Sequence, residues 1–246
     1  MKHLNWKVLT GLLLVLLSAM FYFVHYLIFR DAHHIFIYLI GDIAFLPLEV
    51  LLVTLIIERL LTEREKQAML KKLNMLIGTF YSEVGTELIK YCSASSSDLS
   101  EVRSRMLITI KWIDKDFSNA IEFVRSSDPK LDSRRGDLKM MRDFLQGKRD
   151  FLLGLLANPN LLEHDAFTDI LWAVFHLTEE LSIRSTLEGL PRTDYDHLSG
   201  DMKRAYTQLL SEWLAYMKHL KSDYPYLFSL AVRMNPMDVN ADPVVK

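Results

Sequence analysis

The hydrophobic residues of this chain follow two contrasting patterns. Up to Ile57 they form two almost uninterrupted runs, from Val8 to Phe29 and from Ile35 to Ile57. Beyond Ile57 they recur every three or four positions between charged residues. About 20 helical residues cross the hydrocarbon core of a bilayer, which is about 30 Å thick. The first pattern therefore predicts two transmembrane helices, over residues 8–29 and 35–57, and the second predicts amphipathic helices in water.

The positions of the basic residues predict how this hairpin is oriented. Lys2 and Lys7 precede the first run, whereas the connector carries Arg30 beside Asp31. Five basic residues follow the second run: Arg59, Arg64, Lys66, Lys71 and Lys72. Cytoplasmic flanks carry the excess of Lys and Arg. We therefore expect the hairpin, residues 1–57, to span the inner or plasma membrane with both termini in the cytoplasm.

Five residues interrupt the apolar character of the hairpin: Ser18, His25, Asp42, Pro47 and Glu49. The spacing within Ser18/His25 and within Asp42/Glu49 is nearly two helical turns, so each pair shares one helix face. Charged groups in lipid cost at least ~2.5–3.5 kcal/mol and tend to face protein or water. We hypothesise two polar pairs between the helices, His25–Asp42 and Ser18–Glu49. They either hold helices together, within one chain or across an oligomer, or line an ion pathway.

No helix-breaking residue follows Ile57, and the apolar stripe continues. We therefore predict that the second span runs on as a membrane-exit helix over residues 58–92. Gly78, Ser82 and Gly85 fall near one face of this helix. Because Gly costs up to ~1 kcal/mol in a helix interior, we interpret these small residues as the site of a close crossing with another helix.

A serine-rich stretch, residues 93–97, is expected to be a linker to a cytoplasmic helical bundle, residues 98–236, with a tail over 237–246. Proline-containing stop signals such as Asp128-Pro129 and Asn158-Pro159 divide the bundle. They separate helices expected at about 98–126, 137–157, 161–187, 194–222 and 226–234. The predicted fold class is all-α: a two-helix transmembrane hairpin that continues into a cytoplasmic helical bundle.

Composition and motifs limit the chemistry that we expect. A net charge of −2 gives no overall basic signal for nucleic acid. The single cysteine, Cys92, allows neither an intrachain disulfide framework nor a zinc site built on cysteines. No phosphate-binding loop motif occurs in the sequence. We therefore predict no nucleic-acid partner, no cofactor and no catalytic residues, so the chain is not expected to be an enzyme.

The strongest candidate for chemistry is a group on one helix: His164, His176, Glu179 and Glu180. The i, i+4 spacing of His176 and Glu180 puts both on one helix face, and His197 and His219 lie on the following helix. Di-iron helical bundles carry a Glu-x-x-His motif on each of two helices, and this chain has none. We therefore assign no metal and expect these side chains to be solvated or locally hydrogen-bonded. A helical-bundle metalloprotein is kept as an alternative.

Three stretches carry a resemblance to known proteins: Gly41 to Glu49, Lys72 to Gly78 and Tyr224 to Phe228. They are similar to a family of uncharacterised prokaryotic two-span membrane proteins. The resemblance covers most of the chain, implies a prokaryotic inner or plasma membrane, and supplies no activity.

These observations favour a membrane-anchored helical scaffold or interaction module that self-associates as a homo-oligomer or docks a cytoplasmic protein. The bilayer is its first predicted partner. The leading alternative is an oligomeric channel that uses the face formed by Asp42, Pro47 and Glu49.

Overall fold

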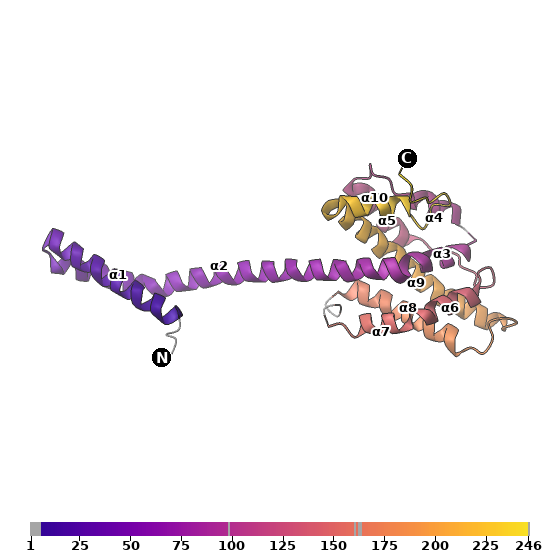
Figure 1. Cartoon of the computed structure of the whole chain (residues 1–246), viewed down its shortest axis with the longest axis horizontal. Helices are drawn as coiled ribbons and strands as arrows, with labels where there is room; N and C mark the ends of the chain where they lie inside the picture. The colour runs from indigo at the N-terminus through magenta and orange to yellow at the C-terminus, as the bar shows by residue number, and fades with distance from the viewer. Residues whose placement is uncertain (1–5, 98, 160, 162–163, 246) are drawn as a thin grey trace. The chain divides into compact units, whose positions relative to one another are not determined.

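The computed structural model describes residues 6–97, 99–159, 161 and 164–245, and these residues are mostly helical (Figure 1). The predicted all-α class is confirmed. The chain divides into two compact units, Met1–Lys66 and Gln67–Lys246. The first unit contains α1 (Trp6–Phe29) and the beginning of α2 (Ala32–Phe80). The second unit contains the end of α2 and the following elements: η1 (Tyr81–Gly85), α3 (Thr86–Ala94), α4 (Leu99–Met106), α5 (Asp114–Ser126), α6 (Leu138–Gly147), α7 (Arg149–Leu156), α8 (Asp165–Ile183), α9 (Arg192–Asp223) and α10 (Pro225–Arg233).

The connector between α1 and α2 is only two residues long, Arg30 and Asp31. Arg30 adopts a left-handed backbone conformation with φ 53°, which reverses the chain. Asp31 Oδ1 then accepts a hydrogen bond of 3.2 Å from the backbone N–H of His34, as a helix N-cap does. This local capping lets α2 begin at Ala32, three residues before the apolar run predicted from Ile35.

Helical structure continues from α2 into α3 through a π-helical turn, η1, which the sequence analysis did not predict. The backbone N–H of Thr86 donates to the carbonyl of Tyr81, five residues earlier. A Cβ on Gly85 would lie 2.5 Å from Cδ1 of Tyr81, so the buried Tyr81 ring occupies the space that a side chain would need. The wider turn and the missing side chain together place this ring in the core.

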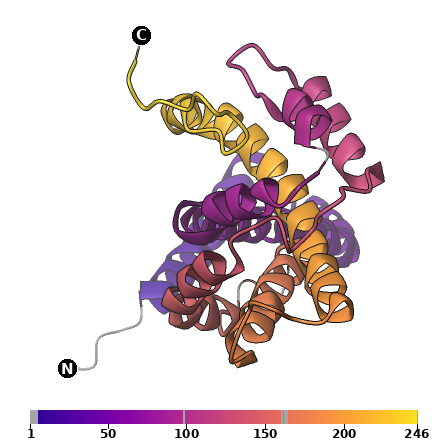
Figure 2. The ribbon, with the colours of Figure 1, turned by 90° about the vertical axis from the view of Figure 1, so that its right-hand side faces the viewer.

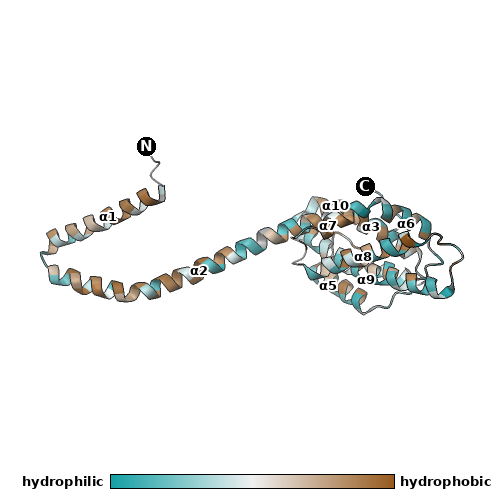
Figure 3. Cartoon of the chain, turned by 90° about the horizontal axis from the view of Figure 1, so that it is seen from below, coloured by the Kyte–Doolittle hydropathy of each residue, from teal (hydrophilic) through white to brown (hydrophobic). Residues whose placement is uncertain are grey.

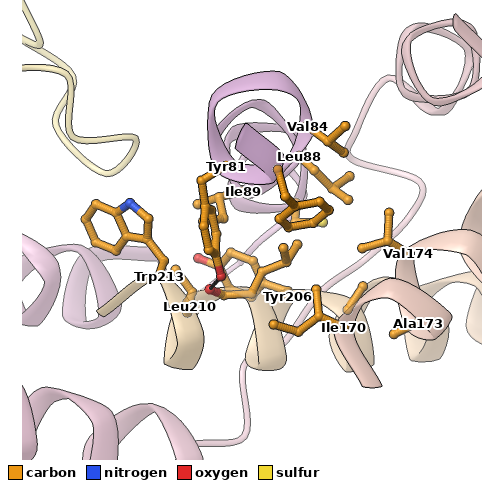
Figure 4. Packing of buried hydrophobic residues seen from close by; sticks show 14 of the residues in the cluster. Tyr81, Val84, Leu88, Ile89, Ile170, Ala173, Val174, Tyr206, Leu210 and Trp213 are labelled. Atoms are coloured by element: carbon orange, nitrogen blue, oxygen red, sulfur yellow. Dashed lines mark hydrogen bonds between the residues drawn. The ribbon is translucent and has the colours of Figure 1, made fainter. Parts of the chain in front are cut away.

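Helix α9 is the centre of the second unit, and Figure 2 shows it running diagonally through the other helices. It packs against α3, α5, α8 and α10. Figure 4 shows Tyr206 and Leu210 of α9 facing Tyr81 and Leu88 on one side and Ile170 of α8 on the other. All five of these side chains are at most 2% exposed. This layer of fully buried side chains holds α9 against the segment that leaves α2.

Two hydrogen bonds fix the register between α9 and the α2–α3 run. Tyr81 Oη donates to the carbonyl of Leu209 over 2.9 Å, and Ser93 Oγ lies 3.0 Å from Tyr206 Oη. Burial raises the pKa of Tyr206 to about 12, so its hydroxyl stays protonated at neutral pH. Each such buried bond contributes about 1 kcal/mol and leaves a costly unpaired group when broken.

The serine-rich segment 93–97 differs from the linker that we predicted. Ser93 is the penultimate residue of α3, and Ser93 and Ser95 are both buried. Ser96 forms an isolated antiparallel bridge with Leu131, and the backbone N–H of Ser97 donates to the carbonyl of Lys130. Serine hydroxyls that satisfy buried partners are part of the core, and composition alone does not distinguish them from a solvated linker.

The helix predicted over about 98–126 is interrupted between α4 and α5. The carbonyl of Met106 accepts a hydrogen bond of 2.8 Å from Asn235 Nδ2. The carbonyls of Ile110 and Trp112 accept from Lys221 Nζ. Side chains from distant parts of the chain therefore satisfy carbonyls that the predicted helix would have used, so tertiary contacts override a local pattern that favours a helix.

The remaining predicted helices occur with shifted ends. The helix predicted over 137–157 is divided at Lys148, where α6 ends and α7 begins. Lys148 Nζ lies 2.7 Å from Glu83 Oε2, which ties this break to η1. Helix α8 is shorter than predicted over 161–187, whereas α9 and α10 begin and end close to their predicted limits.

Two glycine substitutions distinguish the packing around Tyr81 from ordinary helix propensity. Gly85→Ala is expected to destabilise the protein by about 1–3 kcal/mol, because the new methyl group displaces a buried ring. Gly200→Ala serves as the matched control: Gly200 is exposed in α9, and a Cβ at this position would meet no atom within 4 Å. That change is expected to stabilise by about 0.5–1 kcal/mol. Thermal unfolding of the full chain measures both, and equal effects would contradict the π-turn packing.

Candidate functional site

The apolar side chains of the first unit have almost nothing from this chain packed over them. Among its residues with described burial, only His25, Ile35 and Leu39 are partly covered, and the others are exposed. Both helices are long and apolar enough to cross a membrane by length and composition. Figure 3 shows hydrophobic residues dominating α1 and the first part of α2, in contrast to the alternating hydrophilic and hydrophobic residues of the second unit.

His25 and Asp42 lie together at the connector end of the hairpin. They line one pocket of about 370 Å³ with four further residues: Tyr22, His34, Ile35 and Tyr38. The rings of His25 and His34 stack, with centroids 6.0 Å apart and an interplanar angle of 5°. Nδ1 of His25 is buried and has no hydrogen-bond partner among the described residues. The structure therefore places the first predicted polar pair in one pocket and adds His34 and Tyr38 to it.

Ser18, Pro47 and Glu49 are placed differently. Ser18 lies in a shallow hollow lined only by residues of α1. Glu49 is exposed on α2, and within residues 6–97 no hydrogen bond joins it to Ser18. The predicted Ser18–Glu49 pair is therefore not formed in this chain, where α1 and α2 diverge from the connector (Figure 3). Pro47 lies inside α2 without ending it.

The three small residues Gly78, Ser82 and Gly85 occupy distinct environments. A Cβ on Gly78 would lie 2.7 Å from Oη of Tyr216, so α2 approaches a side chain of α9 closely at this point. Gly85 instead accommodates Tyr81 of the same helical run, and Ser82 is exposed. Gly78 and Ser82 line a groove of about 670 Å³ between the end of α2 and helices α9 and α10.

This groove combines cationic and aromatic side chains. Its lining includes Lys71, Lys72, Tyr216, His219 and Tyr224. Nδ1 of His219 lies 2.7 Å from Oδ2 of Asp223, whereas its Nε2 is buried and has no hydrogen-bond partner among the described residues. No local pattern in the sequence marks this groove, because its two walls are more than a hundred residues apart along the chain.

Packing of α8 against α9 brings His176 and Glu180 beside His197 and Asp201. Nε2 of His176 lies 3.4 Å and Nε2 of His197 lies 3.3 Å from the same atom, Oδ2 of Asp201. Glu180 is 3.4 Å from Nε2 of His197 through Oε2 and 3.9 Å from Nε2 of His176 through Oε1. The cluster thus consists of two i, i+4 pairs, one from each helix. The sequence pointed to the α8 pair and to His197 on the next helix, but it did not indicate Asp201.

Arg184, just after α8, holds one edge of this cluster. Its guanidinium donates to Oε2 of Glu180 over 2.7 Å and to both carboxylate oxygens of Asp194 over 2.9 and 2.7 Å. Hydrogen bonds from Arg184 are the main reason why the pKa values of Glu180 and Asp194 are lowered. The same pairing raises the pKa of Arg184. Through Arg184, Glu180 of α8 is therefore linked to Asp194 of α9 next to the histidines. We call this arrangement the charged bridge.

These features define a two-unit, all-helical protein with an exposed apolar hairpin and a helical unit that carries a histidine–carboxylate cluster. Two family models match it: "MJ1433, N-terminal helical domain" over residues 1–61, and "Uncharacterized protein MJ1433, C-terminal helical domain" over residues 69–233. The chain belongs to this MJ1433 family. The predicted resemblance to an uncharacterised family is confirmed, and the two matches separate close to the boundary between the two units.

A relative from Methanocaldococcus jannaschii, described as "Uncharacterized protein MJ1433", is 41% identical over 238 residues. The match covers 97% of this chain and 96% of the relative, so both units are shared. No solved structure matches the chain.

Removing the charged bridge at Arg184 is expected to loosen the connection between α8 and α9. Arg184→Gln should lower the melting temperature by a few degrees, because the Arg184 side chain is only 17% exposed and its bonds are bidentate. Arg192→Gln is the control: Arg192 is 84% exposed and lies 3.7 Å from Asp196, so a negligible change is expected.

The same comparison has a defined pH dependence. Because pairing lowers the pKa values of Glu180 and Asp194 from 4.5 and 3.8, its stabilisation is fully present above about pH 4.5. It is lost as the pH falls through the lowered folded-state values. Melting curves of the wild type and Arg184→Gln should therefore converge in acid. A difference that persists unchanged at low pH would assign the effect to packing.

Proposed function

We propose that this protein is a membrane-anchored helical module whose hairpin crosses a bilayer twice and whose second unit folds in water. The observation that carries the proposal is the exposure of nearly every apolar side chain on α1 and on the first part of α2. Contiguous exposed apolar surface of this extent is not tolerated in water. Helix α1 has 24 residues, which corresponds to about 36 Å and suits one crossing.

The second unit supports the other half of the proposal. Its core is built from its own helices, which mix hydrophilic and hydrophobic residues along their length (Figure 3). Basic residues flank the hairpin at both ends of its sequence: Lys2 and Lys7 precede the first span, and Arg59 and Arg64 follow the second. By the preference of basic flanks for the cytoplasm, both termini and the second unit lie in the cytoplasm.

We expect the protein to remain with membranes in alkaline carbonate, because two buried spans are not released when peripheral contacts are broken. Immunodetection after ultracentrifugation measures this retention. Recovery of the full chain in the supernatant without detergent would contradict the anchor.

Cysteine labelling tests the orientation independently of retention. Ala32→Cys, at the start of α2 directly after the connector, is expected to react with a membrane-impermeant maleimide on intact cells, and Asn240→Cys only after permeabilisation. Both positions are exposed. Cys92 can be kept as the internal control, because burial raises the pKa of its thiol to about 12 and keeps it protonated and shielded at neutral pH. Labelling of Asn240→Cys on intact cells would contradict the proposed topology, because it would place the C-terminus outside the cell.

Self-association in the bilayer follows from the position of Glu49. It is exposed on α2, and no hydrogen bond or ion pair satisfies it within residues 6–97. A carboxyl group inside the hydrocarbon core is stabilised by a polar partner, and a second copy of the hairpin supplies one. An ion pathway along Asp42, Pro47 and Glu49 would need several copies, because two helices enclose no pore.

Glu49→Leu is therefore expected to weaken self-association by about 1–2 kcal/mol, roughly 5- to 30-fold in the association constant. Energy transfer between labelled chains in liposomes measures this change. Leu51→Ala, on a different face of the same helix, is the control and should have little effect. Equal association constants for the wild type and Glu49→Leu would show that Glu49 does not contribute to the interface between copies.

A further inference from the structure

We propose that His176, His197 and Asp201 bind a divalent transition-metal ion such as Zn²⁺ as three protein ligands, with Glu180 beside them. This site lies in the second unit and does not depend on whether the hairpin crosses a membrane. Neutral imidazole nitrogens and carboxylate oxygens are the donors that such ions accept in proteins. The three donors come from two packed helices, which hold them more rigidly than loops do.

The separations between the donor atoms fit one shared ion. Zn²⁺ binds imidazole nitrogen and carboxylate oxygen at about 2.0–2.2 Å, so ligand atoms around a tetrahedral ion are about 3.4 Å apart. The two contacts of Oδ2 of Asp201 are 3.4 Å to His176 and 3.3 Å to His197. Oε2 of Glu180 lies 3.4 Å from Nε2 of His197 but is held by Arg184, so Glu180 flanks the site. The two edges that meet at Oδ2 of Asp201 therefore have the length that tetrahedral coordination requires.

Asp201 provides an independent indication that a cation binds here. Its side chain is 4% exposed, yet Oδ2 is buried and accepts no hydrogen bond from the described residues. Both imidazole nitrogens approach this oxygen without pointing an N–H at it in hydrogen-bonding geometry. A buried carboxylate oxygen without a donor is costly. A cation between Oδ2 and the two Nε2 atoms satisfies all three groups at once.

Two arginines orient the carboxylates around the proposed ion. Nη1 of Arg204 lies 3.4 Å from Oδ1 of Asp201, which leaves Oδ2 directed toward the histidines. Arg184 binds Oε2 of Glu180 and anchors that side chain. Outer contacts of this kind fix ligand orientation in metal sites. His176 and His197 are 46% and 51% exposed, so an ion can enter from solvent without unfolding the bundle.

The test uses the full chain in detergent, purified without a polyhistidine tag and stripped with a chelator. Calorimetric titration with ZnCl₂ is expected to give one ion per chain. Co²⁺ is expected to give visible d–d absorption bands that Zn²⁺ then displaces. Loss of a direct ligand should weaken Zn²⁺ binding on the order of 100-fold, because even outer contacts contribute 10- to 100-fold.

His197→Ala and Asp201→Asn are the informative variants. His197 is half exposed, so its removal leaves the core intact, and circular dichroism verifies that Asp201→Asn keeps its helical content. Asp196→Asn is the matched control, because Asp196 is an exposed acid on the same helix outside the cluster. It should bind Zn²⁺ within about twofold of the wild type. Absence of stoichiometric Zn²⁺ binding, or wild-type affinity in folded His197→Ala, would overturn the proposal.

Discussion

Burial of helix α9 is the constraint on which the second unit depends. Its apolar side chains are covered from several directions by α3, α5, α8 and α10, which come from before and after it in the sequence. The main polar features of this unit are arranged along the helix. The histidine–carboxylate cluster lies near its beginning, Tyr206 and Leu209 fix its middle, and Tyr216 and His219 line the groove near its end. Displacing α9 would therefore change all of them together.

The first unit meets the opposite constraint, because its helices have too few partners to bury their own apolar surface. In a bilayer the same surface needs no protein cover, and the backbone groups of both helices are satisfied within each helix. In the bilayer, the unfavourable free energy comes instead from burying the few polar side chains. His25 and Asp42 share a pocket with His34 and Tyr38, whereas Glu49 is exposed and has no hydrogen bond or ion pair among the described residues. This asymmetry is the physical basis for proposing self-association through Glu49.

Contact between α8 and α9 converts two ordinary helix-face pairs into one polar cluster. Either pair alone is a local i, i+4 arrangement of the kind found on many solvated helices. Together they converge on a buried carboxylate oxygen of Asp201, with Arg204 beside the other oxygen of Asp201 and Arg184 paired with Glu180. The proposed metal ion would thus join two helices that already pack against each other. Metal affinity and helix packing would then reinforce each other.

The amino-acid sequence by itself determined the all-α class, the two apolar runs and the approximate ends of α9 and α10, because periodicity, propensity and proline act locally. It also identified Gly78 as a site of close approach. Only the tertiary structure decided the π turn at Tyr81, the interruption between α4 and α5 and the burial of Ser93 and Ser95. It also decided that His197 and Asp201 join His176. These features depend on the register between distant helices, which interhelical packing sets and a local pattern along one helix does not contain.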